Sequence, residues 1–153
     1  MGTTREILDR ADAAIEARDM EALASFYADD AVITTPDQGE LIGGVALRTY
    51  LDEFLRAFPD VRYEYVQRFE SGHFAVDEGL LIGTHTGPII SPTGETVEPT
   101  GASIRLRSCD VAEIENGLII RHRFYFDQME FLGQLGLVPA QQEAQKSMRD
   151  DTV

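Results

Sequence analysis

The chain has 153 residues, with 27 Asp and Glu against 13 Lys and Arg, so its formal net charge at pH 7 is −14. One domain is enough for this length, and the acidic surface disfavours nucleic acid and anionic membranes as partners, because both would repel it. No apolar run approaches the roughly 20 residues of a membrane span, and the charged N-terminus lacks the apolar centre of a secretory signal, so we expect a cytoplasmic protein.

The first part of the chain has the apolar spacing of amphipathic helices. Apolar residues recur there every three or four positions; in the first segment, for example, Ile7, Ala11 and Ala14 share one face. A β-branched strand follows the second helical segment, and Pro36 begins the turn that ends it. The expected elements are helices over residues 4–18, 20–27 and 45–57 and a strand over residues 31–35.

From Val61 onward the apolar residues alternate, which is the period of β-strands. Helices followed by antiparallel strands predict an α+β fold, with the helices gathered on one face of the sheet. The expected strands cover residues 61–69, 73–86, 102–114 and 118–126, with a loop over 87–101 and an apolar segment over 131–137. We expect a single domain over residues 1–139 and a flexible tail over residues 140–153, which are polar and without periodicity.

Two titratable residues fall on inward faces of the last two strands. In the strand before the Asn-Gly turn, the even positions are mostly apolar and the odd positions hold the charged residues, so Asp110 points inward. In the strand after it, Arg121 and Arg123 occupy one face, and His122 therefore lies on the other, apolar face.

The register of these strands decides whether Asp110 and His122 meet. A two-residue Asn116-Gly117 loop would set Asp110 opposite Arg123, which lies on the wrong face. A three-residue loop with Gly117 in the left-handed conformation instead pairs Asp110 directly with His122. We therefore expect the carboxylate and the imidazole to hydrogen-bond or to share a water, with their Cβ atoms ~5 Å apart.

This pair has two interpretations. It is an acid/base pair at the floor of a ligand pocket, with pKa values shifted by burial, or it is a buried polar pair that fixes strand register. Ser108 on the same face favours a pocket that admits water. No P-loop, dinucleotide-binding glycine pattern, zinc spacing or nucleophile elbow occurs, so we expect no cofactor and no metal.

Other candidates leave alternatives open. His85, where a long strand leaves the sheet, is either a rim residue that contacts ligand or an exposed residue. Tyr63 and Tyr65 share a face and either line the pocket or pack in the core. One of Asp77 and Glu78 must face inward, but the alternation does not say which.

Two further residues have simpler interpretations. Asp127 falls on the outward face at the end of the last strand, and we expect it to cap the helical segment that follows. Cys109 is the single cysteine, so it has no internal disulfide partner, and its outward position indicates an inert thiol.

Several segments resemble SnoaL-like members of the NTF2-like superfamily. The resemblance spans about residues 5–138, implies a cone of helices over a strongly curved antiparallel sheet that encloses an apolar pocket, and implies a homodimer. The branch includes polyketide cyclases, which close a ring by intramolecular aldol chemistry without a cofactor. The segments are FYADDA at 26–31, GTHTG at 83–87, PTG at 99–101, NGLIIRHRFYFD at 116–127 and QLG at 134–136.

The chain departs from these relatives at one important position. The cyclases carry a catalytic aspartate on the last strand where this chain has Phe124, and they carry a histidine at the position of Asp110. The limonene-type epoxide hydrolases also place an aspartate at that last-strand position, and their upstream Arg-x-Asp pair is not found here. Ketosteroid isomerases have an aspartate base at about Thr35 and a tyrosine at about Ala11, and their oxyanion-donating aspartate falls close to Asp110.

We therefore expect a cofactor-independent acid/base enzyme with cyclase, isomerase or hydratase (lyase) chemistry on a small, largely apolar carbonyl or polyketide-like substrate. Asp110 and His122 would relay a proton, and His85 or a pocket tyrosine would polarise an oxygen. The alternatives are a non-catalytic ligand-binding protein in which Phe124 fills the space of a carboxylate, an epoxide hydrolase, and an interaction module that uses the outer sheet face. The expected substrate contacts are His85, Ser108, Phe124, Tyr63, Tyr65 and Phe126.

Overall fold

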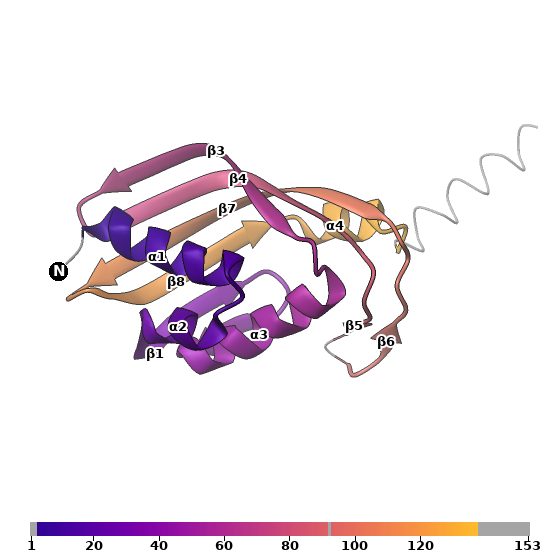
Figure 1. The fold of residues 1–153 in the computed structure, drawn as a ribbon, viewed down its shortest axis with the longest axis horizontal. Helices are drawn as coiled ribbons and strands as arrows, with labels where there is room; N and C mark the ends of the chain where they lie inside the picture. The colour runs from indigo at the N-terminus through magenta and orange to yellow at the C-terminus, as the bar shows by residue number, and fades with distance from the viewer. Residues whose placement is uncertain (1–2, 92, 138–153) are drawn as a thin grey trace, which may run out of the picture.

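The computed structural model describes residues 3–91 and 93–137, and the tail expected over residues 140–153 lies outside them. The helices are α1 (Thr4–Glu16), α2 (Met20–Ser25), α3 (Gly44–Ala57) and α4 (Gln128–Gln134). Figure 1 shows α1, α2 and α3 on one side of a curved sheet, with α4 at its far end. The strands are β1 (Tyr27–Thr35), β2 (Gly39–Ile42), β3 (Arg62–Ser71), β4 (Phe74–Thr84), β5 (Ile89–Ile90), β6 (Thr96–Val97), β7 (Ser103–Glu115) and β8 (Leu118–Phe126).

Six strands form one sheet in the order β2-β1-β8-β7-β4-β3, and β5 pairs with β6 in a separate hairpin. The predicted α+β class is confirmed. One ladder differs from the expected antiparallel arrangement, because β1 runs parallel to β8. In Figure 1 the strands β3, β4, β7 and β8 sweep over α1, α2 and α3, so the inward sheet face and the helices enclose a common interior.

The packing of α1 against this interior follows from its sequence. Thr3 and Glu6 form a capping box that satisfies backbone donors at its first turn. Behind this cap, Leu8 and Ala11 are buried in the main core together with Ile114 of β7. The cap and the buried stripe therefore fix α1 across the sheet.

The turn between β7 and β8 differs from the predicted three-residue loop. Asn116 and Gly117 both have positive φ angles, 53° and 77°, and Glu115 pairs directly with Leu118. Two central residues in this conformation make a type I′ turn, whose twist matches that of the flanking strands. The predicted three-residue loop is therefore wrong.

A β-bulge reconciles this turn with the hydrophobic pattern. Ile114 lies opposite Ile119, but the next pair is Glu113 with Arg121, so Ile120 is an extra residue in β8. One extra residue reverses the side-chain parity beyond it. A two-residue turn and an inward His122 are therefore compatible.

Beyond the bulge, Asp110 lies opposite Phe124, and His122 lies opposite Ala112. The predicted direct pairing of Asp110 with His122 is therefore wrong. The two residues are instead diagonal neighbours on one sheet face, a separation that long side chains can bridge. Both are buried, with 9% and 3% of their surface exposed.

Candidate active site

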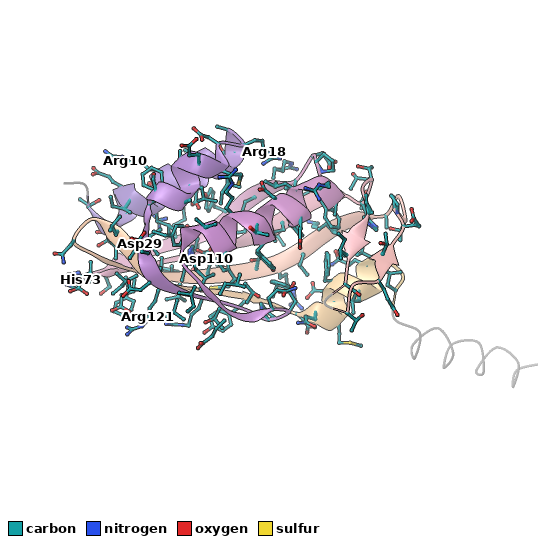
Figure 2. All side chains as sticks on the ribbon, turned by 90° about the horizontal axis from the view of Figure 1, so that it is seen from below. Arg10, Arg18, Asp29, His73, Asp110 and Arg121 are labelled. Carbon is teal, nitrogen blue, oxygen red and sulfur yellow. The ribbon has the colours of Figure 1, made fainter. Side chains whose placement is uncertain are left out.

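A cavity of about 190 Å³ lies between α1, α3 and the inward face of the sheet. Its walls are mainly aromatic and aliphatic, which suits a small and largely apolar ligand. In Figure 2 the labelled Asp110 lies between the helices and the sheet, whereas Arg10 and His73 lie at the periphery. Among the predicted site residues, those that line the cavity are Asp110, His122, Ser108, Tyr63, Tyr65, Phe124 and Phe126.

Asp110 and His122 are joined at the floor of this cavity. Nε2 of His122 lies 2.6 Å from Oδ2 of Asp110. The other carboxylate oxygen of Asp110 has no hydrogen bond from any described residue, and Asp110 lines the cavity. One oxygen is therefore anchored and the other is available to a ligand.

Tyr27 completes a hydrogen-bonded chain that the sequence did not predict. Its hydroxyl lies 2.6 Å from Nδ1 of His122, and burial, followed by the charge of Asp110, raises the pKa of Tyr27 well above its ordinary value. The phenol therefore keeps its proton, and when it donates to Nδ1 the imidazole proton lies on Nε2 and is donated to Asp110. This assignment satisfies every group in the chain when Asp110 is ionised.

The ring of His122 is also held from the side. Phe124 packs against it with ring centroids 4.1 Å apart, and Tyr27 stacks at 5.9 Å. Phe124 thus occupies the position at which the resemblance to the cyclases leads one to expect an aspartate, and it holds the imidazole that orients Asp110. The carboxylate of this site comes from the neighbouring strand, β7.

Asp77 faces inward and Glu78 is exposed, which answers the question that alternation left open. Asp77 lies directly opposite Asp110 in the β4–β7 ladder. Arg5 donates two hydrogen bonds of 2.9 Å to its carboxylate, and Arg68 donates a third of 3.0 Å. Two guanidinium groups therefore balance this buried charge, and the role of Asp77 is structural.

Asp12 of α1 lines the cavity on its helical side and was not among the site residues predicted from the sequence. Its Oδ2 accepts a hydrogen bond of 2.8 Å from the hydroxyl of Tyr65. Burial, followed by the negative charge of Asp110, raises the pKa of Asp12 to about 7. A sequence signal was present, because Asp12 lies one helical turn from both Leu8 and Ile15 and so interrupts an apolar stripe.

His85 lies away from the cavity, and both positions considered for it from the sequence are wrong. It is fully buried, and its ring stacks on Phe58 with centroids 5.3 Å apart. Nδ1 accepts a hydrogen bond of 3.1 Å from the backbone of Thr100, whereas Nε2 has no partner among the described residues. The backbone of His85 donates to Ala102, which turns the side chain into a second apolar cluster at the end of β4.

This burial predicts a pH-dependent stability. Desolvation lowers the pKa of His85 below its ordinary value of 6.5, so the unfolded chain binds a proton more readily than the folded one. The contribution of the neutral His85 side chain to the free energy of unfolding is complete above pH 6.5 and is lost as the pH falls toward the lowered pKa. We expect His85→Asn, which keeps a hydrogen-bond acceptor but does not titrate, to lose less of its free energy of unfolding on acidification than the wild type does.

Urea unfolding of both proteins over a pH series measures the difference between them. We compare the two proteins because Asp12, with its raised pKa, makes a pH-dependent contribution to stability of the opposite sign. That contribution is present in both proteins and cancels in the difference between their free energies of unfolding. Equal pH slopes for the two proteins would contradict the buried neutral imidazole.

Asp127 and Cys109 lie outside the cavity, and their surroundings indicate structural roles. Asp127 caps α4, as predicted, by accepting hydrogen bonds from the backbone of Met129 and Glu130. The thiol of Cys109 is half-buried, and burial raises its pKa, which favours the unreactive thiol form. Within residues 3–91 and 93–137, no group of His, Cys, Asp and Glu side chains is arranged to hold a metal, and no helix is long and apolar enough to cross a membrane.

Comparisons with known proteins place this geometry in a family. A sequence model described as a SnoaL-like domain matches residues 8–122. No curated protein matches the chain.

Solved structures agree on the fold. AclR, a candidate hydroxylase from Streptomyces galilaeus, has a TM-score of 0.74 at 19% identity and covers 89% of this chain and 97% of its own. IdmH, a candidate polyketide cyclase from Streptomyces antibioticus, has a TM-score of 0.72 at 22% identity, with coverages of 88% and 99%. A Catenulispora acidiphila protein of ketosteroid isomerase-like fold, in complex with trimethylamine, has a TM-score of 0.70 at 18% identity, with coverages of 89% and 96%.

Proposed function

Since the chain belongs to the SnoaL-like family, we propose that it is an acid/base enzyme that uses only its own side chains on a small, largely apolar carbonyl substrate. The reaction begins with removal of a proton from the carbon next to the carbonyl group, the step shared by aldol-type cyclisation and isomerisation. The observation that carries this proposal is the chain from Tyr27 through His122 to Asp110, which ends in a carboxylate oxygen open to the cavity.

Asp110 is the base in this proposal. A carboxylate in water is a weak base for a C–H bond, but in an apolar cavity it loses hydration and is held next to the substrate. His122 keeps Oδ2 in place, so Oδ1 faces the ligand. His122 and Tyr27 are positioning residues, because they act through the carboxylate.

The size and lining of the cavity support a small substrate. About 190 Å³ accommodates a compact ring system, and the aromatic walls favour an apolar one. The Catenulispora protein binds trimethylamine, which supports the view that this fold holds small molecules. Aldol-type cyclisation of a polyketide-like chain is the finer form of the proposal.

Proton exchange of a simple ketone tests the proposed function. The α-protons of 2-tetralone in D₂O are followed by NMR with the protein and, as a control, with free acetate and imidazole at the same concentration. We expect exchange at least ~100-fold faster with the protein, because the base is positioned next to the bound ketone. The inert ketone 2,2-dimethylindan-1-one, which has no α-proton, should compete.

The second candidate, a ligand-binding protein, predicts a different result. It is favoured by the packing of Phe124 at the position of the cyclase aspartate. In that case 2,2-dimethylindan-1-one binds, but exchange of 2-tetralone is no faster than with the free buffer groups. This outcome would overturn the enzymatic proposal.

A further inference from the structure

Enolisation needs a proton donor for the carbonyl oxygen as well as a base for the carbon. The cavity tyrosines are the obvious donors, but each already donates its hydroxyl proton inside the protein. Tyr27 donates to His122, Tyr50 to Asp37 at 2.9 Å, Tyr63 to the carbonyl oxygen of Ser108 at 3.1 Å, and Tyr65 to Asp12 at 2.8 Å. The substrate oxygen must therefore find its donor elsewhere in the cavity.

Among the other titratable residues that line the cavity, Glu16, Arg18, Asp37 and Arg62 are exposed, whereas Asp12 is partly buried. We propose that Asp12 is a second catalytic residue, which donates a proton from the helical wall of the cavity to the substrate oxygen while Asp110 removes the proton from carbon. This inference rests on the proposed function and names the acid for the same reaction. Ser108 also lines the cavity, but an alcohol can share its proton with the substrate oxygen only through a hydrogen bond.

The contacts of Asp12 explain why it holds a transferable proton. Its nearest cation, Arg68, lies 3.8 Å from Oδ2 and is committed to Asp77 and Asp9. Burial, followed by the negative charge of Asp110, raises the pKa of this carboxyl group to about 7. A group with this pKa is partly protonated near neutral pH, which suits a general acid.

Tyr65 orients this proton. Its hydroxyl donates to Oδ2 of Asp12, and no described residue hydrogen-bonds Oδ1. Burial raises the pKa of Tyr65, so the phenol remains a donor while Asp12 changes its protonation state. Oδ1 is therefore the oxygen that carries the proton into the cavity.

The step is balanced without any further reactant. The C–H bond breaks, its proton goes to Asp110, and its electron pair forms the carbon–carbon double bond of the enol. The carbonyl π pair moves to oxygen, which takes the proton from Asp12. Asp110 is then a carboxylic acid and Asp12 a carboxylate, and protonation at a new carbon, or attack of the enol on a second carbonyl group, restores both.

A bound inert ketone reports the donor directly. The carbonyl stretch of ¹³C-labelled 2,2-dimethylindan-1-one is recorded by infrared spectroscopy from about pH 5.5 to about pH 8.5, on either side of the pKa of about 7. We expect a band at lower wavenumber at acidic pH that is lost with a midpoint near pH 7. In Asp12→Asn the band should not depend on pH.

Asp52→Asn is the matched control, because Asp52 lies on α3, which also borders the cavity, but pairs with Arg48 at the surface and does not line the cavity. Its band should titrate as in the wild type. A band that titrates unchanged in Asp12→Asn, or that does not titrate in the wild type, would overturn the role of Asp12.

Exchange of 2-tetralone gives a second readout. We expect Asp12→Asn to lower kcat at least ~10-fold with KM changed no more than ~3-fold, and to remove the fall in rate that the wild type shows above about pH 7. An unchanged kcat would reject Asp12 as the acid. If the wild type does not exchange 2-tetralone but its carbonyl band still titrates, the proposed function fails while the donor assignment stands.

Discussion

Replacement of Asp110 by Asn is expected to lower the rate of 2-tetralone exchange at least ~100-fold, the usual contribution of a general base. The amide has nearly the shape of the carboxylate and keeps an oxygen that accepts from Nε2 of His122. The oxygen that faces the cavity is lost as a base, because an amide does not take up a proton near neutral pH. Affinity for 2,2-dimethylindan-1-one should change no more than ~3-fold, since its contacts are mainly apolar.

Glu113→Gln is the matched control for this prediction. Glu113 lies on β7, the strand that carries Asp110, and forms an ion pair of 2.9 Å with Arg121. Neither residue lines the cavity. Its exchange rate should equal that of the wild type. If Asp110→Asn retains most of the exchange activity, Asp110 is not the base.

Replacement of Arg5 by Met is expected to lower the free energy of unfolding by about 3 kcal/mol, the cost of leaving a buried charge without one of its partners. The Asp77 side chain is 1% exposed, and Arg5 supplies two of its three charged hydrogen bonds. The same guanidinium ties α1 to β4, so its loss removes a link between the helical layer and the sheet. Urea unfolding measures the effect.

Arg48→Met tests the specificity of this result. Arg48 pairs with Asp52 at 3.8 Å, and both side chains are exposed, at 49% and 42%. An exposed pair is worth little, so we expect a change below about 0.5 kcal/mol. In the double variant Arg5→Met/Asp77→Asn part of the lost stability should return, because the buried group is now neutral. Equal losses for Arg5→Met and Arg48→Met would contradict the role of the buried network.

The inward placement of Asp110 and His122 could be predicted because side-chain alternation depends only on local strand geometry. Their exact pairing could not. The prediction treated the strand after the turn as regular, whereas Ile120 forms a bulge that shifts the register by one residue. The position of a bulge depends on how the whole sheet packs, which a local pattern does not contain.

Tyr27 and Asp12 were missed for a related reason. Both lie far along the chain from Asp110, and they approach it because β1 pairs in parallel with β8 and α1 lies across the sheet. The sequence placed Tyr27 at the end of a helix, but α2 ends at Ser25 and Tyr27 begins β1. Non-local contacts of this kind decide the chemistry of the cavity.

His85 shows the limit of reasoning from position in a strand. The sequence predicted His85 near the end of a strand over residues 73–86, whereas β4 ends at Thr84, one residue before it. The chain then turns inward, and the imidazole packs against Phe58 of the segment after α3. A strand end is therefore a poor guide to exposure where another apolar cluster covers it.

The most direct test of the central claim is the position of the proton on the ring of His122. Asp110 can act as an ionised base, anchored through Oδ2, only if Nε2 of His122 carries a proton, and in the proposed arrangement Nδ1 accepts from Tyr27. Long-range ¹H–¹⁵N spectra of the labelled protein near neutral pH distinguish the two ring nitrogens, with His122→Gln used to assign the signal among the three histidines. We predict a protonated Nε2 and an unprotonated Nδ1. A proton on Nδ1 with a bare Nε2 would place the acidic proton on Asp110 and contradict its role as the base.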